Sequence, residues 1–309
     1  MTAYIIRRLL WMIPVLLVVT MITFALMHAA PGGAFDSAGP GGRRLPEVII
    51  RNLEAQYGLN DPVPVQYVRW VGNMLVGDFG PSYSYRNRTV NDILFQGLPA
   101  SVQLGSMAFL LSVIVGVPLG VIAALRQNKL PDYVATTISV IGVATPSFII
   151  SVFLQLIFAV NLGWFPTGGW RGPEYWVLPT IALSGFAIAS IARYTRASML
   201  EVTRRDYVRT AQSKGLRERT IVVIHMIRNA LIPVITILGP IFAFLITGSL
   251  IIETIFTIPG IGAFYITSIG TRDYGLIMAL TVLFAVTIAV MNLVVDIAYA
   301  FIDPRIRYS

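Results

Sequence analysis

The chain has 309 residues, of which 56% are apolar and only 12% are charged, and its mean hydropathy is +0.74. A soluble protein of this size could not cover its surface with so few charges, so the composition predicts a protein that crosses a membrane several times. The sequence has no cysteine, which excludes disulfides, thiolate catalysis and cysteine metal sites. We attribute the net charge of +8 to loops at the membrane rather than to nucleic-acid binding.

A membrane-spanning helix needs about 20 apolar residues. Six segments meet this length, so we predict an all-α polytopic membrane protein with six transmembrane helices: 9–27, 101–125, 133–162, 176–192, 231–252 and 276–301. The third segment could hold two short spans instead of one. An extra crossing would place the basic residues of 193–228 on the opposite side from Arg7 and Arg8, which the positive-inside rule disfavours. We therefore expect one span there, with a kink at Pro146.

Residues 1–29 allow two interpretations, a cleaved signal peptide or a first span that stays in the protein. Arg7 and Arg8 precede the apolar run, as in a signal peptide. The run that starts at Leu9 is longer than usual for such a peptide, and the proline after Ala30 disfavours cleavage there. We interpret 1–29 as a short cytoplasmic end followed by a retained transmembrane helix.

Six spans place both termini in the cytoplasm. Fifteen of the 23 basic residues then lie inside, nine of them in 193–228. Six of the eight outside lie in 30–97, a segment long enough that its charges count little toward orientation. This distribution supports a multi-pass topology that ends in a cytoplasmic tail, 304–309.

Residues 30–97 form the only sizeable segment expected outside the membrane. Pro46 can start a helix that ends at Gly58, and Asp61 with Pro62 can cap a second one that ends at Gly77. Thr89 and Asp92 form a possible capping box, and the second helix has an apolar face of Val65, Val68, Val71 and Leu75. We expect a small extracytoplasmic helical insertion that packs on the spans and could dock an external solute receptor.

The basic segment 193–230 is too long and too structured to be a simple connector. Asp206 can cap a short helix, Gly215 can supply the left-handed residue after it, and Leu216 can contact it from beyond. A second helix from about Arg217 should run toward Pro233. Such a stiff protrusion is suited to receive motion from a cytoplasmic partner. A face of small, weakly polar residues could enter a groove of that partner: Tyr207, Val208, Thr210 and Ala211. The alternative is a loop that binds anionic lipid.

Polar residues inside apolar spans are costly, so they are candidates for function. Asp296 in the sixth span is either a pathway charge or the partner of an arginine from 193–228. Glu253 could pair with Arg272 to close an outer gate, or it could be a plain interfacial carboxylate. Gln155 could line a pathway or form a hydrogen bond between helices.

The 206–233 segment resembles the cytoplasmic signature of binding-protein-dependent ABC transporter permeases, which is Glu-Ala-Ala, three residues and Gly. Ala211 and Gly215 match this signature strictly, and Pro233 lies farther from the glycine than in the general pattern. These departures are the form that the peptide-transporter branch carries. Other stretches of that branch follow along the whole chain: Ile6-Arg-Arg-Leu9, Tyr57-Gly-Leu-Asn-Asp-Pro62, Gly77-Asp-Phe-Gly-Pro-Ser82, Gly248-Ser-Leu-Ile-Ile-Glu253, Ile258-Pro-Gly-Ile-Gly262, Arg272-Asp-Tyr274 and Asp303-Pro-Arg-Ile-Arg-Tyr308.

This resemblance implies a type I ABC importer permease fold in the cell inner membrane, with a permease core at 98–303. The chain is similar to the B-type permease of an oligopeptide or dipeptide importer. The implied partners are a C-type permease, two ABC ATPases that bind ATP and Mg²⁺, and a periplasmic or lipid-anchored peptide-binding protein. The chain has no G-x-x-x-x-G-K-[ST] motif, in keeping with ATP hydrolysis in the partners. Within the 204–227 loop, the implied coupling residues are Asp206, Tyr207, Arg209, Thr210, Ala211, Lys214, Gly215 and Leu216.

Three other functions stay open at this point. Permeases for nickel chelates, glutathione or another solute share this pattern. A stand-alone ion-driven transporter would favour paired acidic residues and repeated halves, whereas Asp296 is solitary. An intramembrane enzyme would need a nucleophile with its base or a set of metal ligands, and the only histidines, His28 and His225, are far apart in the sequence.

Overall fold

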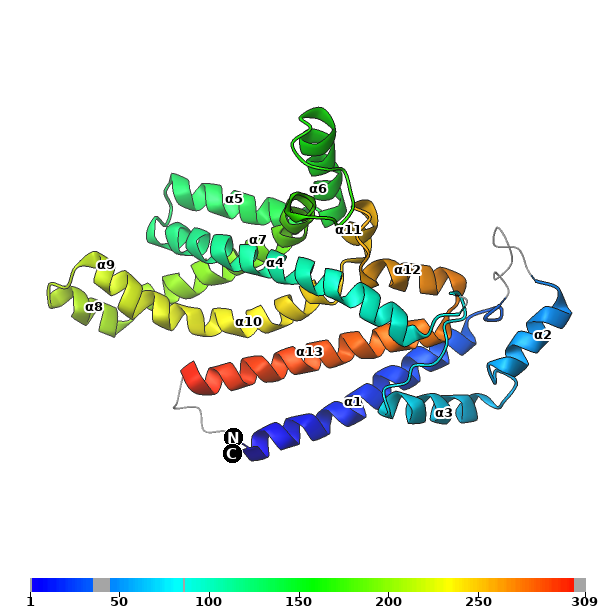
Figure 1. The fold of residues 1–309 in the computed structure, drawn as a ribbon. Helices are drawn as coiled ribbons and strands as arrows, with labels where there is room; N and C mark the ends of the chain where they lie inside the picture. Colours follow the sequence, from blue (N-terminus) through cyan, green and yellow to red (C-terminus); the bar gives the residue numbers. More distant parts are fainter. Residues whose placement is uncertain (1, 36–44, 86, 303–309) are drawn as a thin grey trace. The chain divides into compact units, whose positions relative to one another are not determined.

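The computed structural model describes residues 2–35, 45–85 and 87–302, and helices dominate their regular structure (Figure 1). This confirms the predicted all-α class, while the predicted tail 304–309 lies outside the described residues. In chain order the helices are α1 (Thr2–Ala29), α2 (Glu47–Gln56), α3 (Val63–Leu75), α4 (Val90–Leu125), α5 (Leu130–Ala144), α6 (Ser147–Leu154), the π-helix η2 (Gln155–Asn161), α7 (Pro173–Thr203), α8 (Asp206–Ser213), α9 (Glu218–Thr220), the π-helix η3 (Ile221–Ile227), α10 (Arg228–Ile246), α11 (Leu250–Ile255), α12 (Ile261–Thr271) and α13 (Tyr274–Ile302).

Five helical stretches of the described chain are long and apolar enough to cross a membrane: α1, α4, α7, the run Glu218–Ile255 and α13. Helix α5 and the α6–η2 helix are together long enough for a sixth crossing, but the chain bends by 103° between them. They add a crossing only if they count as one broken span. Pro146 explains the break, because proline cannot donate the helical hydrogen bond and forces the residue before it out of the helical region. Thr145 is accordingly extended, with φ −88° and ψ 120°. The bend is far sharper than the kink that the sequence predicts.

The described chain packs as two compact units. Among the described residues, one unit contains those up to Ser101 together with Pro259–Ala289, and the other contains Val102–Ile258 together with those from Val290 to Ile302. Helices α4 and α13 therefore contribute to both units. The predicted extracytoplasmic segment folds together with α1, α12 and the first half of α13.

Close helix contacts in the second unit depend on small residues. Gly116 and Gly120 lie one turn apart on α4, and a β-carbon added at Gly120 would stand 2.5 Å from the carbonyl oxygen of Ala192 and 2.6 Å from Cβ of Thr195 on α7. Gly105 meets the backbone of α10 at a similar distance, 2.4 Å from the carbonyl oxygen of Leu245. At these positions the absence of a side chain allows the helices to pack closely.

The proline and glycine signals in the sequence correctly predict where the helices α2 and α3 of the first unit begin and end. Helices α2 and α3 begin directly after Pro46 and Pro62, and each is followed within two residues by a glycine with positive φ, Gly58 at 67° and Gly77 at 78°. The predicted cap by Asp61 is wrong, because its carboxylate binds Arg69 Nη2 at 2.6 Å instead.

The predicted capping box at the start of α4 is confirmed. The Thr89 N–H donates to Asp92 Oδ2 at 3.0 Å, and the Asp92 N–H donates to Thr89 Oγ1 at 3.1 Å. Two backbone donors that the helix itself cannot satisfy thus find partners. The box fixes where α4 begins.

The glycine contact between α4 and α7 can be tested with a matched pair of variants. We expect Gly120→Ala to lower the free energy of unfolding by roughly 1–3 kcal/mol, because the added methyl group has no room against the α7 backbone. Gly72→Ala on α3 is the control, since nothing lies within 4 Å of its added carbon. Thermal unfolding in detergent would show a loss for the first variant only. Equal melting temperatures for both would contradict the packing described.

Candidate functional site

The candidate coupling helix, α8, begins one residue earlier than its predicted cap implies. Arg205 is the residue before the helix, with an extended backbone (φ −76°, ψ 146°), and Asp206 is the first helical residue. The prediction that Asp206 is the cap is therefore wrong. Its carboxylate still lies in the first turn, where the positive end of the helix dipole favours a negative charge.

The far end of α8 closes as the sequence predicts. Gly215 has φ +72°, its N–H donates to the Gln212 carbonyl at 2.9 Å, and the Leu216 N–H donates to the Ala211 carbonyl at 3.3 Å. This pair of bonds is the Schellman motif, which needs a left-handed residue at the position of Gly215. A β-branched side chain there would be strained even though the space around it is open.

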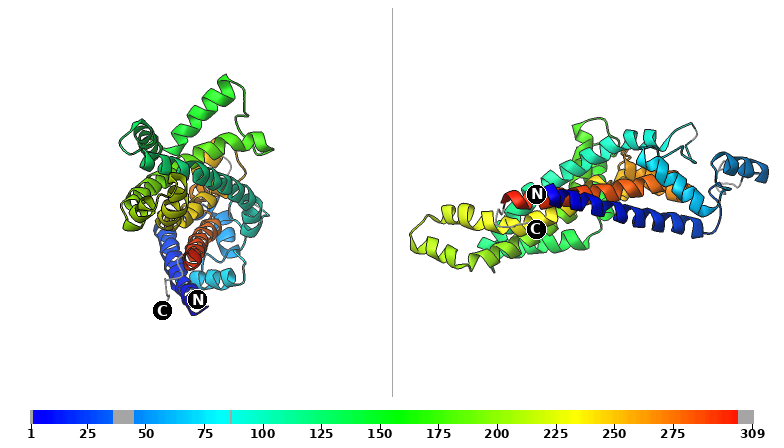
Figure 2. Two further views of the ribbon diagram at one scale, coloured as in Figure 1. Left: turned by 90° about the vertical axis from the view of Figure 1, so that its left-hand side faces the viewer. Right: turned by 90° about the horizontal axis from the view of Figure 1, so that it is seen from below.

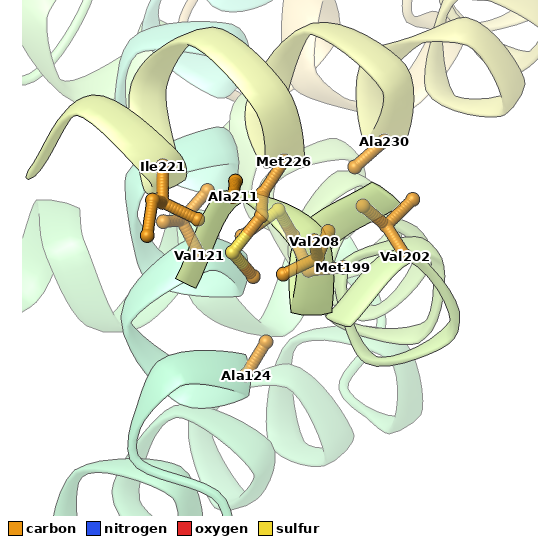
Figure 3. Packing of buried hydrophobic residues seen from close by; sticks show 9 residues of the cluster. All are labelled: Val121, Ala124, Met199, Val202, Val208, Ala211, Ile221, Met226 and Ala230. Carbon is orange, nitrogen blue, oxygen red and sulfur yellow. The ribbon is translucent and has the colours of Figure 1, made fainter. Parts of the chain in front are cut away.

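The inner face of α8 is held in an apolar cluster (Figure 3). Val208 and Ala211 are buried there, so the prediction that they face a partner protein is wrong. The other members come from α4, α7, η3 and α10: Val121, Ala124, Met199, Val202, Ile221, Met226 and Ala230. Because α8 is packed on all of these elements, a force on it acts on several helices together.

The outer face of α8 is basic. Among Glu201–Arg219 there are six basic residues and three acidic ones, which leaves an excess of three positive charges. Arg205 pairs with Glu201, and Arg209 Nη1 lies 3.9 Å from Asp206 Oδ1, but both pairs are exposed and contribute little to stability. The exposed coupling candidates are Asp206, Tyr207, Arg209, Thr210, Lys214, Gly215 and Leu216.

The chain returns from α8 in one continuous helical run through α9, η3 and α10. It starts at Glu218 and continues past Pro233, as predicted for the second helix of this segment. The π-helical stretch η3 was not predicted. Helices of this type are rare and often mark functional sites.

A buried ion pair next to this region was missed in the sequence. Arg196 on α7 binds Asp132 on α5 through two parallel contacts, Nε–Oδ1 at 2.6 Å and Nη2–Oδ2 at 2.8 Å. The Asp132 side chain is 4% exposed and also accepts the Asn128 N–H at 2.9 Å. The pair joins the start of α5 to α7. The only sequence signal was that both residues fall near the cytoplasmic ends of predicted spans.

A second buried carboxylate organises the first unit. Asp273 Oδ2 accepts the Ser82 hydroxyl and the backbone N–H groups of Tyr83 (3.0 Å) and Ser84 (3.1 Å), and Oδ1 accepts the Leu276 N–H at 3.2 Å. Burial and the nearby carboxylate raise the pKa of the Tyr83 phenol. Asp273 therefore caps α13 and fastens the loop before α4 to it. This explains why two motifs so distant in sequence belong together.

The polar residues predicted for a gate or pathway have varied surroundings. Gln155 donates to the Thr167 carbonyl, so it holds the loop after η2. Glu253 is buried in α11 and accepts the Ser249 N–H at 3.2 Å. Arg272 has φ 56° and donates to the carbonyls of residues 31 (2.6 Å) and 33 (3.3 Å). Asp296 is half-buried in α13. The roles predicted for these four residues stay predictions.

A cavity of about 560 Å³ lies in the second unit. Two breaks in the helices border it, at Thr145–Pro146 between α5 and α6 and at Gly248–Ser249 between α10 and α11. Its lining is mostly apolar, with Phe186 and Phe244 as its largest side chains. Within the hydrocarbon region of a membrane, irregular backbone is tolerated only where protein covers it or where it lines a solvated cavity.

Comparison with known proteins identifies the family. Residues 116–308 match the binding-protein-dependent transport system inner membrane component, and residues 1–105 match the amino-terminal part of the same membrane component. The chain belongs to this family of permeases. The resemblance found in its motifs is thereby confirmed over almost the whole length.

Full-length relatives within the family are transport permeases. The chain is 45% identical over 310 residues to the oligopeptide transport system permease protein OppB of Salmonella typhimurium, with 100% of both chains covered. It is 46% identical over 307 residues to the dipeptide transport system permease protein DppB of Bacillus subtilis, with 99% of this chain and 98% of that protein covered.

Solved structures show the same fold. The MetNI methionine ABC transporter in its inward-facing conformation matches 68% of this chain and 96% of its own, with a TM-score of 0.57 and 16% identity. An amino acid ABC transporter with histidines matches with a TM-score of 0.54 and 17% identity. The predicted type I importer permease fold is confirmed.

The ion pair of Asp132 and Arg196 can be tested by removing one partner or both. We expect Arg196→Met alone to destabilise the subunit by about 3–5 kcal/mol, because it leaves the buried Asp132 carboxylate without its partner. Asp132→Asn alone should also destabilise the subunit, but by less, because the Arg196 side chain that it leaves unpaired is 30% exposed. The double variant should be closer to the wild type than either single one. Arg205→Gln breaks only an exposed pair and serves as control. Additive losses in thermal unfolding would contradict a coupled pair.

Proposed function

We propose that this protein is the permease subunit of an ATP-driven importer that takes up oligopeptides or dipeptides delivered by a binding protein. The strongest support for this proposal is the sequence identity of 45–46% to peptide permeases across essentially the whole chain. The chain would form half of the translocation pathway beside a C-type permease. Two ABC ATPases bind ATP and Mg²⁺ in this proposal, and a periplasmic or lipid-anchored protein supplies the peptide. The permease itself catalyses no reaction.

The proposed coupling element is α8 with its flanking turns. Two features support this role: its inner face is packed into several helices at once, and its outer face presents exposed polar and basic side chains. The excess of positive charge suits an acidic groove on an ATPase. Val208 and Ala211 act in this proposal as anchors, whereas Tyr207, Arg209 and Lys214 make the contact.

The proposed topology places both termini and α8 in the cytoplasm. The nine basic residues of 193–228 support it, because positive charge gathers on the cytoplasmic side of short loops. In this proposal the 560 Å³ cavity is the part of the pathway within this subunit, and the broken helices that border it support this. Transporters commonly bind solutes at such discontinuities.

Gly215 provides the test of coupling. We expect Gly215→Val to abolish most peptide uptake by the assembled transporter in proteoliposomes while ATP hydrolysis continues, because valine cannot adopt φ +72° without strain. Gly215→Asn is the matched control, since asparagine tolerates this conformation and should retain uptake. Normal uptake by the valine variant, with the complex intact, would remove the coupling role.

The solute can be tested by competition. Uptake of a labelled dipeptide or oligopeptide by the reconstituted transporter with its binding protein should fall when unlabelled peptides are added, and it should not respond to a nickel chelate or glutathione. The alternatives are permeases for those compounds or for another solute. Competition by either one, without competition by peptides, would replace peptide uptake with the competing solute.

A further inference from the structure

The exposed face of α3 is apolar, contrary to what an aqueous environment favours. Residues at helical spacing form a stripe along its outer side, and their exposed fractions are high: Val65 46%, Val68 69%, Leu75 77% and Val76 81%. Gly72 lies in the same sector, and the exposed polar residues Arg69 and Asn73 border it on one side. A helix of a protein cap would instead turn its polar residues outward. The predicted apolar face exists, and in the part of the chain that the structure describes most of it is exposed.

Contacts of α3 with α1 fix how deep it lies. The Tyr67 hydroxyl donates to the Leu17 carbonyl at 3.1 Å and lies 2.9 Å from Thr20 Oγ1, and its ring packs edge-on against Phe24. Helix α3 therefore lies beside the carboxy-terminal half of α1 (Figures 1 and 2). It does not sit above the end of that helix.

The depth follows from the length of α1. Its apolar stretch Ile5–Ala29 has 25 residues and rises about 37 Å, about 7 Å more than a hydrocarbon core of ~30 Å. Leu17 lies twelve residues before Ala29, or about 18 Å along the axis. Even if all the excess length projects outward, the carbonyl that Tyr67 binds lies about 10 Å inside the hydrocarbon.

Two polar side chains of α3 find partners within the protein, whereas Trp70 Nε1 is buried without a hydrogen-bond partner among the described residues and Asn73 is exposed. The Gln66 amide donates to the carbonyls of Leu59 (2.9 Å) and Asp61 (2.8 Å), and Arg69, the only charged residue of α3, is neutralised by Asp61 at 2.6 Å. Internal satisfaction of polar groups is what a lipid environment demands.

We infer that α3 is embedded in the outer half of the bilayer, and that lipid acyl chains cover its valine and leucine stripe. Like this stripe, the surface of α1 has exposed apolar side chains: Met21, Ile22 and Leu26 are more than half exposed. The segment between the first two long helices would thus be partly a membrane element that widens the lipid contact of α1. This inference does not depend on the solute carried.

Single cysteines give a direct test, because the natural chain has none. Nitroxide labels are placed at Val68→Cys and Leu75→Cys in the complete transporter, reconstituted in phospholipid vesicles. Ile22→Cys on α1 is the lipid control, and Arg51→Cys, on the charged helix α2, is the water control. Collision rates are measured with oxygen, which concentrates in lipid, and with a water-soluble nickel complex.

We expect the oxygen-to-nickel ratio at both α3 positions to match that of Ile22→Cys and to exceed that of Arg51→Cys several-fold. A ratio equal to the water control would overturn the inference, as would low collision rates with both reagents, which would indicate that a partner protein covers the stripe. A charge provides a second readout. Val68→Lys should lower the amount of subunit inserted in the membrane several-fold, whereas Val48→Lys on α2 should not. Equal insertion of the two lysine variants would also count against burial in lipid.

Discussion

Helix α8 packs on the ends of three long helical stretches, α4, α7 and the run of η3 and α10. Any motion of α8 that is to move these helices must pass through this contact. Two small apolar side chains, Val208 and Ala211, fill the space between α7 and the run of η3 and α10. Burying side chains of this size contributes only about 1–3 kcal/mol each, but the contact is shared by several elements. Interiors packed at this density transmit displacement rather than absorbing it. The exposed residues of α8 can therefore be selected for a partner without weakening the anchor.

Local sequence rules predicted what local physics decides. The capping box at Thr89 and Asp92 and the left-handed Gly215 each depend on residues within one or two turns, and both were predicted correctly. Asp206 failed as a cap because Arg205, which offers no capping oxygen, occupies that position in the fold. The Pro146 break was foreseen in place but not in size, because a proline removes a hydrogen bond while the tertiary contacts of α6 with α7 set the angle.

Pairs that are distant in the sequence were out of reach. Asp132 and Arg196 are 64 positions apart, and nothing local distinguishes this arginine from Arg193. The clamp at Asp273 likewise joins residues 189–191 positions apart. An apolar helical face presents a related problem, since the pattern of α3 is the same whether a protein core or lipid covers it. Only the contact of Tyr67 with the middle of α1 distinguishes the two.

The buried pair of Asp132 and Arg196 bears on how motion could reach the cavity. Arg196 stands two turns before the end of α7, close to the cluster that holds α8, while Asp132 begins α5. The other end of α5 is the break at Thr145 and Pro146, which borders the 560 Å³ cavity. A bidentate guanidinium–carboxylate pair resists sliding more than apolar contacts do, because its two hydrogen bonds are directional. It would therefore keep α5 moving with α7, so that a displacement imposed on α8 changes the cavity at the break instead of dissipating between the helices.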